Sequence, residues 1–142
     1  MNGVEGFRGE FRFLSNFWPA RVRVSGVVYP TVEHAFVACK TLDLEVRLRV
    51  AACTSPGEAK RLGRTVALRP GWDGMRLEVM RELLRVKFRR GSVLAGRLLA
   101  TGDAELVEVN EWNDRFWGVC RGVGENWLGR LLMEIRAGLA AG

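Results

Sequence analysis

Apolar side chains at the spacing of one helix face dominate the chain between residues 74 and 90. The side chains that form this stripe are Val79, Met80, Leu83, Leu84 and Phe88. A helix with one apolar face must bury that face against other elements, so this segment predicts a long helix that packs on a core. A second leucine-rich stripe predicts a last helix over about 127–140.

The region before the long helix predicts one hairpin and three shorter helices. The segment "RVRVSGVVYP" (21–30) alternates around Ser25-Gly26 and is typical of a β-hairpin. "EFRFLSNFWP", which precedes it, predicts a strand that leads into a loop. Helices are expected at about 31–42, 44–53 and 56–64. The third has the clearest start, because Ser55 can cap it, Pro56 suits the first helical position and Glu58 lies three residues after the cap.

After the long helix, Ser92 can cap a short helix that ends at Gly102, and "AELVEV" (104–109) predicts a strand. Residues 110–126 predict a long loop. The chain has 142 residues, 48% of them hydrophobic, which suffices for one core. We therefore expect an α+β fold: one compact, mostly helical domain over residues 1–142, with a small N-terminal β-hairpin or sheet.

Composition excludes several classes of protein. No apolar run approaches the ~18–20 residues that span a bilayer, and the N-terminal "MNGVEGFRGEF" lacks the pattern of a signal peptide. We expect a soluble, cytoplasmic protein with no membrane partner. Cys39, Cys53 and Cys120 include no CxxC pair and have apolar neighbours, which indicates buried thiols. With one histidine in the chain, we expect no metal site, and we expect no cofactor.

The net charge of +6 and the sequence pI of about 10.0 suit a polyanionic partner or a phosphorylated ligand. The alternative is a solvated surface that carries no specific function, because the charges are spread along the chain. Arginine greatly outnumbers lysine, and the lysines are Lys40, Lys60 and Lys87. A lysine amine can lose its proton and act as a nucleophile, whereas a guanidinium effectively cannot. Lys60 and Lys87 are expected to be structural or solvated.

The segment "YPTVEHAFVACKT" (29–41) places two charges in an otherwise apolar helix. Glu33 and Lys40 are two turns apart and fall within about 20° of each other around the helix axis. Only His34 and Thr41 have a clearly outer direction, so the charged pair is expected to lie against the protein body. Two interpretations remain open. Each charge is held by a separate partner, or the pair forms the wall of a cleft with acid–base chemistry.

The 110–126 loop is long enough to indicate a function, since such loops are uncommon in small domains. Its polar and flat side chains are Trp112, Asn113, Asp114, Trp117 and Asn126. Gly118, Gly122 and Gly124 would allow close backbone approach. The alternative readings are a turn or cap for Asp114 and core packing for each Trp. Two carboxylates, an amine and aromatic plates together suggest cleavage of a glycosidic bond to a planar group through an oxocarbenium-like ribose.

The sequence resembles the NADAR family, also called YbiA-like, in ordered blocks along nearly the whole chain. The blocks are "FRFLSNFWP", "YPTVEHAFVACKT", "SPGEAKRLGR", "LRPGWDGMR", "VMRELLRVKF", "LLATGDAELVE", "DRFWGVC" and "GENWLGRLLMEIR". The resemblance implies a mostly helical α+β fold and an N-glycosidase that acts on ribosides. Activities associated with the family are hydrolysis of phosphorylated ribosylamino-pyrimidine intermediates of riboflavin synthesis and removal of ADP-ribose from guanine.

The resemblance also implies roles for individual residues. Glu33, Lys40 and Asp114 match catalytic positions. The expected substrate-binding residues are Asn16, Arg64, Trp72, Trp117 and Asn126, with Trp72 and Trp117 bracketing the base. For Arg64 a phosphate contact and a surface role are both open. Two departures stand out: Val37-Ala38-Cys39 replaces the frequent Gln-Ala-Ala, and "VCRGVGEN" differs from the "GDGG" type of the riboflavin-linked branch.

Three functional hypotheses follow. The first is a glycosidase of a small riboside phosphate or an ADP-ribose-like molecule. The second is a hydrolase of ADP-ribose attached to nucleic acid, which the positive charge would favour. The third is a non-catalytic binding domain for such ligands. Lys40 has two possible roles in the enzymes, as a cation that binds phosphate or sugar, or as a nucleophile that forms a Schiff base with the opened ribose.

Overall fold

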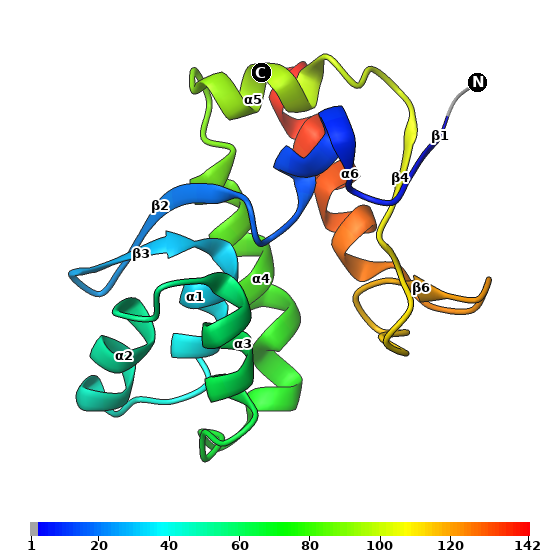
Figure 1. The fold of residues 1–142 in the computed structure, drawn as a ribbon. Helices are drawn as coiled ribbons and strands as arrows, with labels where there is room; N and C mark the ends of the chain where they lie inside the picture. Colours follow the sequence, from blue (N-terminus) through cyan, green and yellow to red (C-terminus); the bar gives the residue numbers. More distant parts are fainter. Residues whose placement is uncertain (1–2) are drawn as a thin grey trace. The chain divides into compact units, whose positions relative to one another are not determined.

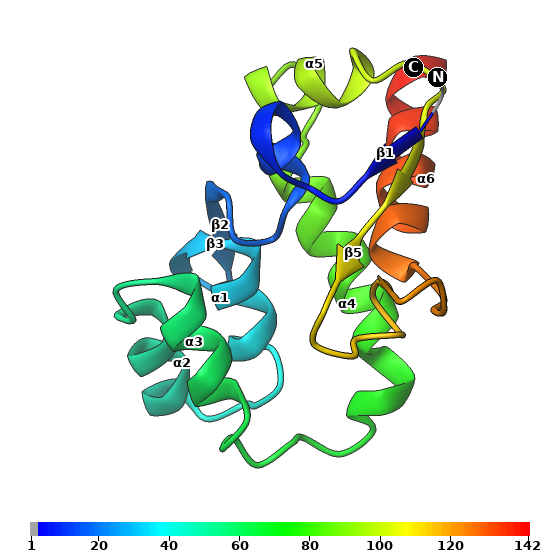
Figure 2. The ribbon, with the colours of Figure 1, turned by 45° about the vertical axis from the view of Figure 1, so that its right-hand side comes forward.

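The computed structural model describes residues 3–142, which divide into two units (Figures 1 and 2). The first unit contains the described residues up to Ser15 together with Phe88–Gly142, and the second contains Asn16–Lys87. The second unit holds the hairpin and most of the helices predicted in the first half of the chain. The fold is α+β and mostly helical with small sheets, as the sequence predicts.

The hairpin of the second unit consists of β2 (Pro19–Val24) and β3 (Val27–Thr31), paired antiparallel. The φ angles of Ser25 and Gly26, 49° and 84°, are both positive, as a two-residue turn of type I′ requires. The predicted hairpin is confirmed. Val22 and Tyr29, which pair across the strands, are fully buried, so one face of the hairpin closes the core beside α1 (Figure 1).

Three short helices follow the hairpin, each with a side-chain cap. They are α1 (Val32–Ala38), α2 (Leu44–Ala51) and α3 (Pro56–Gly63). Thr31, Asp43 and Ser55 accept hydrogen bonds from backbone N–H groups in the first turns, which satisfies donors that a helix start leaves open. The predicted cap at Ser55 is confirmed. The first helix is shorter than predicted, because it ends at Ala38 and Lys40 lies in the turn that follows.

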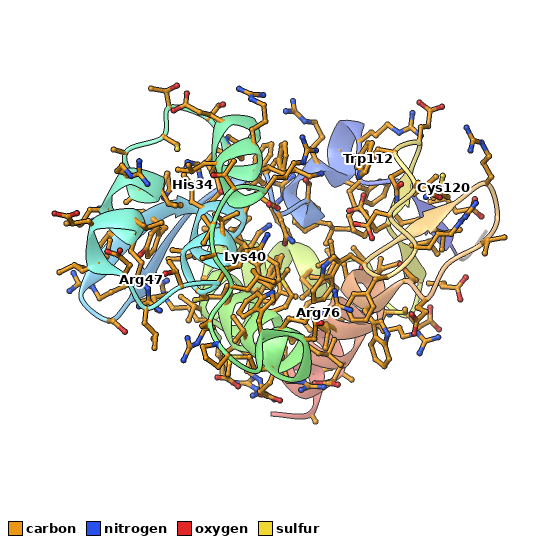
Figure 3. The ribbon with its side chains drawn as sticks, turned by 90° about the horizontal axis from the view of Figure 1, so that it is seen from below. His34, Lys40, Arg47, Arg76, Trp112 and Cys120 are labelled. Carbon is orange, nitrogen blue, oxygen red and sulfur yellow. The ribbon has the colours of Figure 1, made fainter. Side chains whose placement is uncertain are left out.

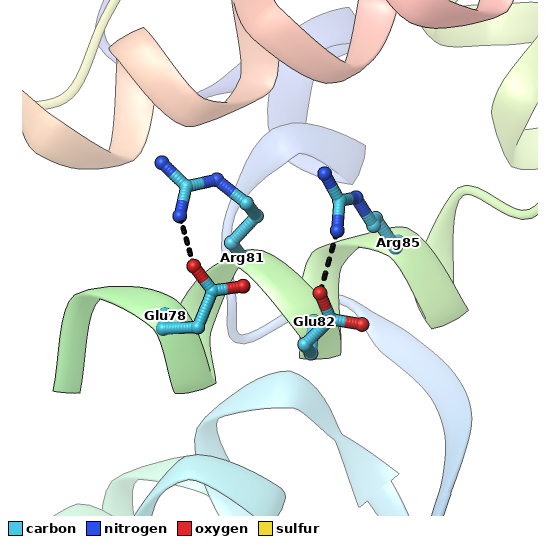
Figure 4. A network of polar contacts seen from close by, with 4 residues as sticks. All are labelled: Glu78, Arg81, Glu82 and Arg85. Carbon is cyan, nitrogen blue, oxygen red and sulfur yellow. Dashed lines mark hydrogen bonds and ion pairs between the residues drawn. The ribbon is translucent and has the colours of Figure 1, made fainter. Parts of the chain in front are cut away.

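Helix α4 (Trp72–Lys87) is the long helix predicted from the apolar stripe. Met80, Leu83 and Leu84 are buried and form its inner face. On its polar side Arg81 pairs with Glu78 and Arg85 pairs with Glu82 at 2.5 Å (Figure 4). The partners of each pair are one turn apart, and both glutamates are exposed, so each pair contributes only ~0.3–0.5 kcal/mol to helix stability.

The first unit combines short strands with two helices. Its elements are β1 (Gly3–Glu5), the 3₁₀ helix η1 (Gly9–Leu14), α5 (Val93–Leu99), β4 (Glu105–Val107), β5 (Val109–Asn110), β6 (Val119–Cys120) and α6 (Trp127–Ala141). Strand β1 pairs in parallel with β4, and β5 pairs in parallel with β6. Ser92 caps α5 as predicted, through a hydrogen bond that its hydroxyl accepts from Ala95 N. The apolar face of α6 packs beside β4.

The strand predicted within "EFRFLSNFWP" is wrong, because residues 9–14 form η1. The turn buries Phe13 and Leu14 together, which an extended segment with alternating faces would not do. Arg97 from α5 lies over the Phe13 ring, 4.3 Å from its centroid, and donates to the Glu10 carbonyl. Tertiary packing within this unit therefore overrides the local preference for a strand.

The outward directions predicted for His34 and Thr41 are also wrong. His34 is 1% exposed and Thr41 is 8% exposed. His34 Nδ1 lies 2.7 Å from Thr31 Oγ1, and Nε2 lies 3.1 Å from the Cys53 carbonyl. Both ring nitrogens are thus bonded inside the unit, and the histidine ties the start of α1 to the segment before α3.

All three cysteines are buried and free of disulfides, as the sequence predicts. Within residues 3–142 we find no helix with the length and apolar content to span a bilayer.

Candidate active site

Glu33 and Lys40 lie at opposite ends of α1, in the second unit. Glu33 is in the first turn of the helix, and Lys40 is in the turn that ends it, with its N–H bonded to the Val37 carbonyl at 3.1 Å. Both side chains are half-buried, whereas every residue between them is buried. The prediction that the pair lies against the protein body is consistent with this burial.

Several charges surround the Lys40 amine. Burial lowers the pKa of Lys40, the Glu33 carboxylate raises it, and the cations Arg64 and Lys60 lower it further. The pair is thus electrostatically coupled, although it spans two helical turns. The net result is an ammonium with a pKa below its usual range, which increases the fraction of free amine at neutral pH.

Helix α3 brings Lys60 and Arg64 to this cluster. Lys60 is half-buried, with its amine 5.9 Å from the centroid of the Phe17 ring, and Arg64 is exposed at the C-cap of the helix. A Cβ on Gly63 would lie 2.9 Å from a Val37 methyl and 3.4 Å from Lys40 Nζ. Only a glycine allows α3 to approach α1 and the lysine so closely.

Lys60 and Gly63 contribute to this site although neither was expected there from the sequence. The i, i+4 spacing of Lys60 and Arg64 on a helix is the signal that could have indicated a shared face.

Asn16 is joined directly to the Glu33 backbone. Its carbonyl accepts a hydrogen bond from Glu33 N at 3.1 Å, and its side-chain Nδ2 donates to Met80 Sδ at 3.6 Å. The side-chain Oδ1 is buried, and no group among the described residues bonds to it. A buried acceptor without a partner costs free energy, so a donor on a ligand or a water would stabilise it.

Trp72 does not present an open plate, contrary to the expectation that it brackets a base. Its side chain is 5% exposed at the start of α4, and its ring packs on Phe36 with a centroid separation of 5.2 Å and an interplanar angle of 53°. Phe36 in turn lies 6.0 Å from Lys40 Nζ. Trp72 therefore belongs to the packed wall that lowers the polarity around the lysine.

Asp114 organises its own loop in the first unit. Its Oδ1 accepts hydrogen bonds from Phe116 N at 3.2 Å and Trp117 N at 2.9 Å, while its backbone N–H and carbonyl are both bonded to the side chain of Asn110. This is the turn role that the sequence left open. Among residues 3–142 only Oδ1 of this carboxylate accepts a hydrogen bond, which leaves the second oxygen for another role, and the catalytic assignment stays a prediction.

Asn126 also makes structural bonds in this unit. Its Oδ1 accepts from Glu108 N, and its Nδ2 donates to the Leu106 carbonyl, both at 2.9 Å. The residue precedes α6 with a left-handed φ of 53°. These bonds fix the start of α6 against the neighbouring strands, and a substrate contact at Asn126 remains a prediction.

The glycines of the loop accommodate the protein's own backbone. A Cβ on Gly118 would meet the Glu108 carbonyl at 2.4 Å, and one on Gly124 would meet the Gly118 carbonyl at 2.1 Å. At Gly122 nothing lies within 4 Å, and its φ of 77° explains the glycine. For Gly118 and Gly124 the expected close approach is therefore internal.

Trp112 and Trp117 differ in exposure. Trp112 is 62% exposed, while Trp117 is half-buried and meets Phe116 edge-on, with ring centroids 4.7 Å apart at 89°. The Trp112 ring is thus largely exposed to solvent, while the Trp117 ring is partly packed and partly exposed.

We predict that Trp117→Ala weakens ligand binding more than it weakens the fold. Stacking of a base on an aromatic ring contributes ~1–3 kcal/mol to binding, whereas truncation of a fully buried Trp costs ~3–5 kcal/mol of folding stability. The melting temperature and the ligand dissociation constant, measured on the same preparation, separate the two. A large loss of stability at unchanged affinity would assign Trp117 to packing alone.

The structure thus gathers Asn16, Glu33, Lys40 and Arg64 into one cluster of the second unit (Figure 3 labels Lys40). Asp114, Trp117 and Asn126 lie in the first unit, where Asp114 accepts from Trp117 N, and Asn126 N donates to the Gly118 carbonyl. This arrangement defines a small α+β protein with a lysine–glutamate pair set among cations.

Comparison with known proteins agrees with this description. The model of the NADAR domain matches residues 6–140. The chain is 45% identical over 132 residues to N-glycosidase YbiA of Escherichia coli strain K12, an alignment that covers 89% of this chain and 81% of that protein. The chain belongs to the NADAR domain family.

A solved structure and a second relative extend the comparison. The NMR structure of E. coli YbiA superimposes with a TM-score of 0.85 at 39% identity and covers 99% of this chain and 87% of that one. The Riboflavin biosynthesis protein VVA0006 of Vibrio vulnificus is 42% identical over 127 residues, 87% of this chain but 34% of that longer protein. The resemblance and the fold class predicted from the sequence are confirmed.

Proposed function

We propose that this chain hydrolyses the N-glycosidic bond between a base or amine and a phosphorylated ribose or ADP-ribose, with Glu33 and Lys40 as the reacting groups. The chain is a glycosidase, a hydrolase of N-glycosyl compounds, like its relatives named N-glycosidase. The observation that carries the residue assignment is the coupled Glu33–Lys40 pair, half-buried beside two further cations.

Glu33 suits the proton chemistry of this reaction. Cleavage of an N-glycosidic bond leaves an electron pair on the departing nitrogen, which must receive a proton, and it leaves positive charge on the ribose. A carboxyl group can give the proton, and the resulting carboxylate can stabilise the cationic sugar or orient its hydroxyls. Lys40 at the other end of the helix keeps a positive charge or a polar amine close to this carboxylate.

For Lys40 we favour the nucleophilic role over the role of a fixed cation. Its lowered pKa makes the free amine more accessible, and Arg64 and Lys60 already supply positive charge for a phosphate. Attack of the amine on C1 with departure of the base, followed by ring opening, gives an imine. Water then attacks the imine carbon and releases the sugar from the amine. As a cation, Lys40 would instead bind phosphate or a sugar oxygen, and water would attack C1 directly.

The partner is a small riboside phosphate or an ADP-ribose-like molecule, and the second candidate is ADP-ribosylated guanine in nucleic acid. The net charge of +6 favours the second, because phosphates are attracted to such a surface. The relative named for riboflavin biosynthesis favours the first. A non-catalytic ADP-ribose or nucleic-acid binding domain would not need the coupled lysine and glutamate.

The deciding experiment incubates the purified protein separately with ADP-ribosylated guanine DNA, NAD, ADP-ribose and ribosylamino-pyrimidine phosphates. Mass spectrometry then identifies any released base or amine and the sugar product. Release from one class assigns the substrate. No release from any of them, combined with tight binding of one, would support the binding-domain alternative and contradict the proposed reaction.

We predict that Glu33→Gln removes turnover and leaves the fold intact. Glutamine keeps the shape of the side chain and the Asn16–Glu33 backbone bond, but it loses the charge and the exchangeable proton. Loss of a general acid or base costs on the order of 10²–10⁴-fold in rate. Glu45→Gln, at an exposed residue of α2, is the matched control. Full activity in a correctly folded Glu33→Gln protein would remove Glu33 from the mechanism.

A further inference from the structure

The turn that carries Lys40, residues 38–41, lies at the end of helix α1, where carbonyl groups have no partner inside the helix. The last carbonyls of any helix lack partners inside it and form its negative end. The last turn of α1 contains no basic residue of its own. Within the turn, Thr41 N donates to the Ala38 carbonyl at 3.3 Å, and two arginines from other segments donate to the carbonyls of residues 38–41.

Arg47 from α2 bridges the two ends of this turn. Its Nε donates to the Ala38 carbonyl at 3.2 Å and to the Thr41 carbonyl at 2.9 Å (Figure 3 labels Arg47 and Lys40). The Arg47 charge also lowers the pKa values of the Tyr29 phenol and the Cys39 thiol, both of which burial raises more strongly. The half-buried Arg47 guanidinium thus lies close both to β3 and to the end of α1.

Arg69 holds the residues between these two ends. Its backbone N–H donates to the Lys40 carbonyl at 2.7 Å, and its Nη1 donates to the Cys39 carbonyl at 3.4 Å. With Lys40 N bonded to Val37, both backbone polar groups of the lysine are engaged. Every carbonyl from Ala38 to Thr41 consequently accepts a hydrogen bond from one of the two arginines.

We propose that Arg47, assisted by Arg69, is a positioning residue for Lys40: it fixes the 38–41 turn from which the lysine side chain extends over the Phe36 ring. This inference rests on the proposed function, because it assigns Arg47 a role through Lys40 and no contact with the substrate. A lysine stem is flexible, so the place where it leaves the backbone decides which positions the amine can reach. A misplacement of about 1 Å at a reacting group can cost about 100-fold in rate.

The first measurement requires no turnover. Reductive methylation with ¹³C-formaldehyde labels the amines, and the chain has only three lysines to resolve by NMR. We expect Arg47→Ala to raise the Lys40 pKa towards that of an ordinary lysine, because burial is the main cause of its lowering and a released turn admits water. Arg49→Ala, at an exposed arginine of the same helix, should leave the Lys40 titration unchanged.

The second measurement uses the best substrate found for the wild type. Arg47→Ala is expected to lower kcat by about 100-fold with little change in KM. Arg47→Lys, which keeps a charge near the helix end, should recover part of kcat. Arg69→Ala should have a smaller effect, since its side chain makes the longer bond and its backbone N–H remains.

The outcomes separate this inference from the proposed function. A wild type that cleaves none of the ribosides contradicts the proposed function. The Lys40 titration then still tests whether Arg47 fixes the 38–41 turn, because it requires no turnover. An active wild type, combined with folded Arg47→Ala that keeps the wild-type Lys40 titration and kcat, would overturn the positioning role. Should Arg47→Ala fail to fold, Arg47→Lys decides by the same two readouts.

Discussion

Cyanoborohydride added during turnover is expected to attach the sugar of the substrate to Lys40, and Lys40→Arg is expected to lose turnover. The reagent delivers a hydride to the imine carbon and converts it to a stable secondary amine, so the mass of the protein increases by that of the reduced sugar. Arginine retains the charge but cannot form the imine. The lowered pKa of Lys40 increases the fraction of free amine available for attack.

The pH dependence of the trapping rate provides an independent test of the nucleophilic role of Lys40. Attack requires the free amine, so the trapping rate should increase as the pH rises through the lowered pKa of Lys40 and should level off below the range of an ordinary lysine. A pH profile that rises only in the range of ordinary lysines would contradict the claim that burial activates this amine.

Peptide mapping identifies the lysine that carries the adduct and is the control for the site of attack. The adduct should be found on Lys40 and not on Lys60 or Lys87. Lys87 is 3% exposed, so a substrate cannot reach it, which excludes the solvated alternative that the sequence allowed. If no adduct forms and Lys40→Arg keeps substantial turnover, Lys40 acts only as a cation. Water activation would then fall to Glu33, with Asp114 as the second carboxylate to test.

Features set by neighbouring residues were predictable from the sequence. The Ser25-Gly26 turn and the caps at Ser55 and Ser92 depend on side chains one to four positions away, and the structure has all three. The apolar stripe of α4 was predictable for the same reason, because helical periodicity is local. In the site, the sequence placed Glu33 and Lys40 against the protein body, and both side chains are half-buried, although Lys40 lies in the turn beyond α1.

Features set by distant contacts were not predictable. His34 has an outward direction on the helix considered alone, but α2, α3, α4 and the β2–β3 hairpin all pack around α1, and His34 Nε2 meets the Cys53 carbonyl. From the sequence, Trp72 was expected to bracket the base, and only its contact with Phe36 shows that its ring is packed. The support of the Lys40 turn by Arg47 and Arg69 likewise joins segments that periodicity does not relate.

The largest effect on stability is expected at Lys87, where we predict that Lys87→Met stabilises the protein at neutral and acidic pH. Burial lowers the pKa of Lys87 from 10.5 to about 7. Between these values the unfolded chain binds a proton that the folded chain does not, so the free energy of unfolding rises with pH. This difference in the Lys87 pKa between the unfolded and the folded chain corresponds to roughly 4–5 kcal/mol of unfolding free energy, which is an upper limit for the stabilisation by Lys87→Met. Methionine has a similar length and no charge to desolvate.

The test compares the free energy of unfolding by urea at pH 7 and pH 9 for the wild type, Lys87→Met and Val86→Met. The wild type should gain roughly 2–3 kcal/mol from Lys87 over this interval, a contribution that Lys87→Met removes. Taking the difference between the two proteins cancels the titration of cysteines and tyrosine, which both contain. Val86→Met introduces a methionine at the neighbouring position without removing an amine. Its unfolding free energy should therefore rise between pH 7 and pH 9 as much as that of the wild type. If the unfolding free energy changed equally between pH 7 and pH 9 for the wild type and Lys87→Met, Lys87 would keep its proton in the fold and the predicted stabilisation would be wrong.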